Sequence, residues 1–83
     1  MNLFLISQTS NNDYDTYDSA VVCAKNEDHA RKMSPGGKDG EKAEFGQHHS
    51  DWAYRLEDVS VKLIGKAVKG MPVGVVCSSF NAG

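Results

Sequence analysis

Three short segments of the chain are apolar at consecutive positions, and long polar stretches separate them. They are Leu3 to Ile6, Ala20 to Ala24 and Val73 to Cys77. A strand with one face in water alternates apolar and polar residues, whereas consecutive apolar residues indicate a strand that is covered on both faces. We therefore predict three such strands, at residues 2–8, 19–25 and 73–80.

A fourth strand is predicted at residues 59–68, where the alternation is clearer. Its apolar face carries Val59, Val61 and Leu63, and its outward face carries Ser60, Lys62 and Lys66. Outward lysines are typical of an edge strand, because their charge discourages pairing with another sheet. Gly65 indicates a bulge within this strand.

A helix of about two turns is predicted after the second strand. Asn26 is a suitable N-cap, since its side-chain oxygen can accept an orphan backbone N–H. Acidic residues at 27–28 and basic residues at 31–32 match the helix dipole, and Ala30 with Met33 forms a narrow apolar stripe. The sequence Pro-Gly-Gly at 35–37 ends the helix. So short a helix needs a sheet to pack on.

The remaining stretches are polar. Residues 9–18 are dense in turn formers, which predicts a loop joining a wide antiparallel hairpin. Residues 34–50 predict a second loop, of a length that is usually either functional or disordered. The segment 51–56 is open between two interpretations: an alternating strand, or a single helical turn capped by Asp51.

The element order predicts one α+β domain spanning residues 1–83, with polar loops at 9–18 and 34–50. Its mainly antiparallel sheet of four to five strands has the order β-β-α-β-β, with one short helix packed on one face. That helix cannot cover both faces of the sheet. The second face must be covered by the loops, by aromatics such as Trp52 and Tyr54, or by another chain. An uncovered apolar face of this size would be a partner site.

Composition excludes several classes of protein. With 40% apolar residues and a net charge of −2, the chain is too apolar for a disordered protein and too balanced for a general nucleic-acid binder. Cys23 and Cys77 lie inside apolar runs, which predicts reduced core residues of an intracellular protein; one bridge between neighbouring strands is the alternative. The apolar run near the N-terminus is too short for a signal peptide or a membrane span, so we expect a cytoplasmic protein.

No catalytic residue, metal site or cofactor is predicted. His48 and His49 are adjacent and lack the spacing of zinc ligands. Both cysteines lie among apolar residues, where a reactive thiolate is not expected. The lysines at 62, 66 and 69 lack interleaved aromatics, so we expect no direct nucleic-acid binding.

The stretch 11–18 alternates aspartate with tyrosine, a combination of hydrogen-bond acceptors and rigid amphipathic rings that suits a protein interface. Its carboxylates could also imitate a nucleic-acid backbone against a basic partner. The predicted partner-binding residues are Asp13, Tyr14, Asp15, Tyr17, Asp18, Trp52 and Tyr54.

Three stretches carry a resemblance to a known group of proteins: Tyr14 to Val22, Asn26 to Arg31, and Ser79 to Gly83. They resemble short uncharacterised proteins of tailed phages and prophages. The resemblance implies no catalytic residues. It implies an accessory viral protein, acting in the host cytoplasm, that binds and blocks a host machine as anti-CRISPR and other anti-defence inhibitors do.

The leading hypothesis is therefore a non-enzymatic inhibitor that occludes a surface of a host protein or protein–nucleic-acid complex. Two other classes stay open. One is a small metal- or nucleotide-binding domain with residues 34–50 as a lid. The other is a self-associating structural protein, whose second sheet face is buried in a homodimer.

Overall fold

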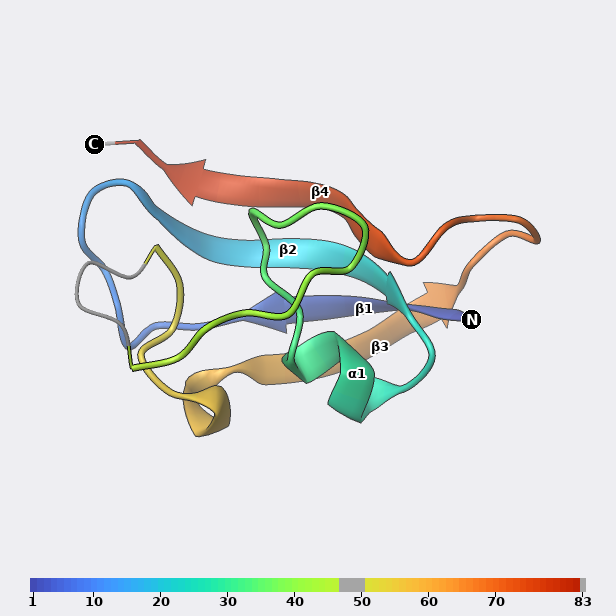
Figure 1. Ribbon diagram of the computed structural model, residues 1–83, viewed down its shortest axis with the longest axis horizontal. Helices are drawn as coiled ribbons and strands as arrows, with labels where there is room; N and C mark the ends of the chain where they lie inside the picture. The colour runs from blue at the N-terminus through green and yellow to red at the C-terminus, as the bar shows by residue number, and fades with distance from the viewer. Residues whose placement is uncertain (47–50, 83) are drawn as a thin grey trace.

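A computed structural model describes residues 1–46 and 51–82. Four strands form one antiparallel sheet in the order β3-β1-β2-β4, with a short helix, α1, after β2 (Figure 1). The elements are β1 (Asn2–Ser7), β2 (Thr16–Ala24), α1 (Glu27–Arg31), a 3₁₀ turn η1 (Leu56–Asp58), β3 (Ser60–Lys66) and β4 (Gly74–Asn81). The predicted α+β class and the order β-β-α-β-β are confirmed.

Side chains of the two central strands alternate between the two faces of the sheet. Phe4 lies opposite Val22 and Ile6 opposite Ala20, and all four are buried on the face toward α1. Intervening residues point to the other face, where Leu5 and Val21 are only half-buried and Cys23 is fully buried. Neighbouring residues of one apolar run therefore lie in two different environments, the core on one face of the sheet and the uncovered surface on the other.

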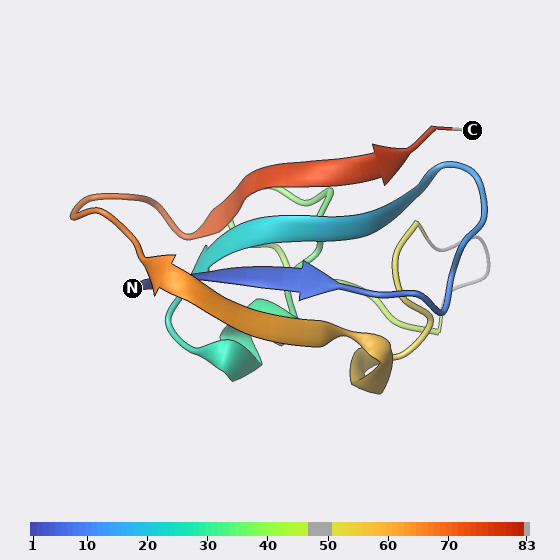
Figure 2. The same cartoon turned by 180° about the vertical axis from the view of Figure 1, so that it is seen from behind.

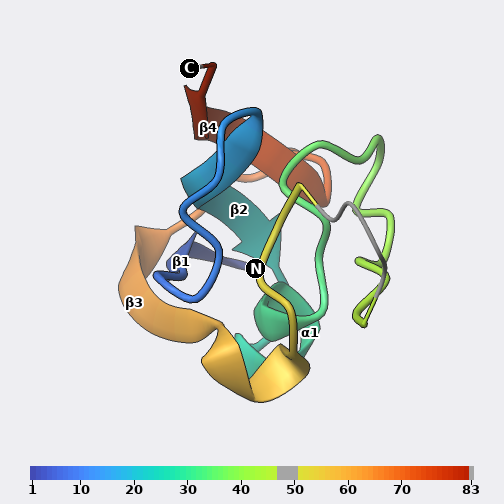
Figure 3. The same cartoon turned by 90° about the vertical axis from the view of Figure 1, so that its left-hand side faces the viewer.

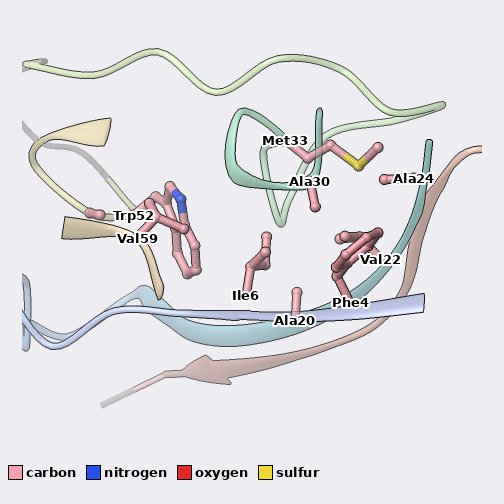
Figure 4. Packing of buried hydrophobic residues seen from close by; sticks show 10 residues of the cluster. Phe4, Ile6, Ala20, Val22, Ala24, Ala30, Met33, Trp52 and Val59 are labelled. Atoms are coloured by element: carbon pink, nitrogen blue, oxygen red, sulfur yellow. The ribbon is translucent and has the colours of Figure 1, made fainter. Parts of the chain in front are cut away.

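The core lies between the sheet and the segments that follow β2 (Figure 4). Trp52 and Val59 fill one end, and Met33 with Ala30 of α1 fills the other. Its buried members are Phe4, Ile6, Ala20, Val22, Ala24, Ala30, Met33, Trp52, Ala53 and Val59.

Helix α1 begins where its sequence predicts but ends earlier, at Arg31, because the chain leaves the helix at Lys32 and Met33 pairs with Lys42 in an isolated bridge. The Oδ1 atom of Asn26 accepts a hydrogen bond from the backbone N–H of His29 at 2.8 Å, which is the expected N-cap. Arg31 forms an ion pair with Glu27 at 3.0 Å and also donates a hydrogen bond to the carbonyl of Val59. This second bond connects the helix to the residue that immediately precedes β3. The buried Ala30 provides its contact with the sheet.

The polar stretches cover the same face as α1. Residues 32–46 and 51–59 pass over that face, and Ala43 and Phe45 pack against the core (Figures 1 and 3). Seen from behind, the sheet has no element in front of it (Figure 2). The prediction that the apolar strands are covered on both faces is therefore wrong for most of β1 and β2, because the loops and Trp52 lie on the face that α1 already occupies. It holds at the end of β2, where Cys23 is fully buried on the other face and its Sγ lies 3.9 Å from the carbonyl oxygen of Met71.

Several element boundaries differ from the sequence-based prediction. Strand β2 begins at Thr16, within the predicted loop, because Thr16 and Tyr17 pair with the end of β4. The segment 51–55 is neither strand nor helix, and the 3₁₀ turn starts only at Leu56. The bulge expected in β3 is present one residue before Gly65, at Ile64.

Candidate functional site

The turn between β1 and β2 is held from inside by buried polar side chains. Gln8 is 4% exposed, and its Nε2 donates to the carbonyls of Asn11 and Tyr17, both at 2.9 Å. Its Oε1 accepts from the backbone N–H of Asn11 at 2.8 Å and from Ser10 Oγ at 3.3 Å. Since a buried amide is stable only when hydrogen-bonded, this network fixes the shape of the turn.

The aromatic segment 51–54 is bonded to the same turn. Asn11 Nδ2 donates to the carbonyl of Trp52 at 2.9 Å, and the backbone N–H of Tyr17 donates to the carbonyl of Asp51 at 2.7 Å. The Tyr54 hydroxyl lies 3.3 Å from Asn11 Oδ1 and 3.5 Å from Asp13 Oδ2. The two stretches that the sequence predicted as one interface are therefore side by side.

The end of β4 completes this part of the molecule. The backbone N–H of Asp15 donates to the carbonyl of Asn81 at 2.6 Å, and Asn81 Nδ2 lies 3.5 Å from the carbonyl of Asp13. The rings of Tyr17 and Phe80 contact each other in a tilted arrangement, with centroids 4.7 Å apart. Asp15 adopts a left-handed backbone with φ of 61°, a conformation that aspartate tolerates better than most residues.

These contacts create an exposed surface that we call the acidic tip. Tyr14 is 75% exposed and Tyr54 is 42% exposed. Among the described residues, the exposed carboxylates of the tip form no ion pair, and the neighbouring Arg55 lies 3.8 Å from Glu57 instead. The acidic tip consists of Asp13, Tyr14, Asp15, Asp18, Asp51 and Tyr54.

Two predicted contact residues lie elsewhere than expected. Trp52 is 2% exposed and forms part of the core, so it supports the tip from below and presents no surface to a partner. Tyr17 is half-buried against Phe80 and likewise acts as a support.

Sequence reasoning missed two contributors to the tip. Asp51 was expected only as a cap, and its place in the tip depends on a contact between distant segments. Gln8 could have been recognised, because it continues the inward-facing series that begins with Phe4 and Ile6, and a buried glutamine must bond to something.

The uncovered face of the sheet is a second candidate surface (Figure 2). Leu5, Val21 and Cys77 are cross-strand neighbours on it, and a shallow hollow of about 160 Å³ lies among them. Leu5 and Val21 are half-buried while Cys77 is exposed, so the prediction of two buried cysteines holds for Cys23 alone. Both cysteines are free.

The described part of the chain contains no group of three or more metal-ligating side chains. His48 and His49 lie outside the described residues. His29 accepts a hydrogen bond from the backbone N–H of Lys25 at 3.2 Å. No helix among residues 1–46 and 51–82 is long and apolar enough to cross a membrane.

Comparisons with known proteins add no identification. The chain matches no protein-family model, no curated protein and no solved structure.

Proposed function

We propose that this protein is a non-enzymatic binding protein that occludes a surface of a larger protein or protein–nucleic-acid complex, and that the acidic tip carries the contact. The observation behind the proposal is that exposed tyrosines and several aspartates converge on one rigidly held end of the molecule. Tyrosine provides a large contact area with little loss of conformational entropy, and the carboxylates provide acceptors for arginine and lysine.

The construction of the tip favours binding. Gln8 and Asn11 bond the turn to itself and to segment 51–54, so few degrees of freedom remain to be lost on association. The backbone at Asp15 is anchored to β4 in the same way. A preorganised surface binds more tightly than a flexible loop of the same composition.

The charge of the tip specifies the chemistry of the partner. Among the described residues the carboxylates of the tip have no ion-pair partner, and a basic surface would supply one. The partner would therefore present lysine and arginine side chains, as many nucleic-acid-binding surfaces do. Such an interaction weakens as salt rises, because exposed charges are screened.

The resemblance to short tailed-phage and prophage proteins supports an inhibitory role. In this proposal the protein is an anti-defence inhibitor of the anti-CRISPR type, it acts in the cytoplasm of the host cell, and its target is a host machine. The acidic tip would compete with nucleic acid, or with another acidic ligand, for a basic surface of that target.

The test is affinity capture of the partner from a bacterial extract, using the wild-type protein and two variants. In the first variant, Asp13, Asp15 and Asp18 are all changed to Asn. This change removes three charges and keeps the shape of each side chain, and asparagine tolerates the left-handed backbone of Asp15 as well as aspartate does. The matched control changes three exposed acids elsewhere, Asp39→Asn, Glu41→Gln and Glu44→Gln.

We expect the tip variant to lose the captured protein while the control retains it, with both thermal midpoints close to that of the wild type. Reversal of the same three tip aspartates to lysine should abolish capture altogether. If binding survives the reversal, the acidic tip is not the contact surface.

A further inference from the structure

The turn at residues 34–37 lies directly against Tyr17, which supports the acidic tip. A Cβ atom added at Gly36 would lie 3.0 Å from both Cε2 and Oη of the Tyr17 side chain, so the ring would have to move by a few tenths of an ångström. The φ of Gly36 is not in the left-handed region, so the backbone itself does not require glycine at this position. Glycine is required because the ring of Tyr17 occupies the space of a side chain.

A short antiparallel ladder holds this turn in place. Met33 and Lys42 form an isolated bridge, and the backbone N–H of Ser34 donates to the carbonyl of Glu41 at 2.8 Å. Met33 is 1% exposed and belongs to the core, so the ladder is anchored to the rest of the molecule. In Figure 1 the segment passes over β2. Because the turn is held at its base, we expect a side chain at Gly36 to displace the ring rather than the turn.

Tyr17 connects this turn to the acidic tip. Its carbonyl accepts a hydrogen bond from Gln8 Nε2 at 2.9 Å, and its backbone N–H donates to the carbonyl of Asp51 at 2.7 Å. Its ring packs on Phe80, with centroids 4.7 Å apart, and this contact limits how far the ring can turn away. Asp18 is the next residue in the chain. A displacement of Tyr17 therefore reaches Asp18 and Asp51, two acidic residues of the tip, through the main chain.

We infer that Gly36 is a positioning residue of the acidic tip, and that the turn at residues 34–37 acts on the tip through the ring of Tyr17. A glycine there lets the ring take the position in which both backbone hydrogen bonds of Tyr17 are formed. This part of the second polar loop therefore supports the binding surface without touching a partner. The functional part of the inference rests on the proposed function, because it concerns the shape of that surface.

The test is a double-mutant cycle that combines Gly36→Ala with Tyr17→Leu, a change that removes the ring. The first readout needs no partner. It is the hydrogen-exchange rate of the backbone amides of residues 15 and 17, which bond to Asn81 and Asp51, relative to the amides of β1. The second readout is the amount of protein captured from the bacterial extract, at a temperature well below the thermal midpoint of each variant.

Two further variants complete the set. Tyr17→Phe keeps the packing on Phe80 and removes only the contact of Oη with position 36, so it serves if Tyr17→Leu does not fold. The matched control is Gly65→Ala, because a Cβ at Gly65 would have nothing within 4 Å.

We expect Gly36→Ala to speed exchange at residues 15 and 17 at least about threefold, with the amides of β1 unchanged. Capture should fall by at least about threefold, because a binding surface must be held close to its productive geometry. After Tyr17→Leu, Gly36→Ala should change neither readout, and after Tyr17→Phe its effect should be smaller than in the wild type. Gly65→Ala should change neither readout in any background.

Unchanged exchange at residues 15 and 17 in Gly36→Ala would overturn the inference, and so would an effect that is equally large after Tyr17→Leu. Faster exchange with unchanged capture would overturn the claim that Gly36 positions a binding surface. If the wild-type protein captures nothing, the proposed function fails, and the exchange rates alone decide whether Gly36 positions the tip.

Discussion

Replacement of Gln8 by alanine tests whether buried hydrogen bonds hold the acidic tip. The change removes bonds to the backbone N–H and C=O of Asn11 and to the C=O of Tyr17, at 2.8 to 2.9 Å. The two Asn11 groups are buried, and an unsatisfied buried group costs about 1–3 kcal/mol. Allowing for partial relaxation, we expect a loss of about 3 kcal/mol in the free energy of unfolding.

That loss is large for this chain. A domain of this size has a total stability of about 4–12 kcal/mol, and each kcal/mol lost lowers the thermal midpoint by about 4–8 °C. The fall should therefore be about 12–24 °C. The assay is urea unfolding followed by the fluorescence of Trp52, whose carbonyl accepts a bond from Asn11 in the same network.

Two control variants distinguish the loss of hydrogen bonds from the loss of side-chain volume and from the effect of a substitution elsewhere in the turn. Gln8→Met keeps the side-chain volume and leaves the same backbone groups unsatisfied, so it should destabilise nearly as much as alanine. Thr9→Ala changes an exposed neighbour and should stay within about 0.5 kcal/mol of the wild type. If Gln8→Ala were also within that range, the network would not hold the turn, and the argument for a preorganised tip would fail.

Three further predictions follow from the fold. Asn26→Ala should lower stability by about 1 kcal/mol in a thermal melt, because the cap bond to His29 is lost, whereas Asn26→Asp should not. Gly74→Ala should cost more than about 1 kcal/mol, since Gly74 has φ of 139° and a Cβ there would lie 3.2 Å from the backbone nitrogen of Gly40; Gly65→Ala, with open space, should cost less. A thiol reagent should label the exposed Cys77 in the native protein and reach the buried Cys23 only on unfolding; equal native labelling of both would contradict the strand register.

The strands and the helix could be predicted because their signals are local. Apolar runs mark β1 and β2, and Asn26 with the charge order after it marks α1. The lysines of β3 predicted an edge strand correctly, because charged side chains that protect an edge can be recognised in the sequence itself.

The candidate site could be predicted only in part, because long-range contacts decide it. The sequence predicts that the Asp/Tyr stretch and Tyr54 are exposed, but only the fold shows that Asn11 bonds to Trp52 across the chain. Trp52 is buried because Val59 and the sheet close over it, which no local pattern indicates. The starting residue of β2 depends on its pairing with the end of β4, which is a matter of register.

The central claim is that the charges of the acidic tip bind a basic partner. Its most direct test is calorimetric titration of the captured partner with the wild-type protein and with the variant in which Asp13, Asp15 and Asp18 are changed to Asn. We predict at least a tenfold loss of affinity for the variant, and an affinity of the wild type that falls as salt is raised. Equal affinities of the two proteins, independent of salt, would contradict the account.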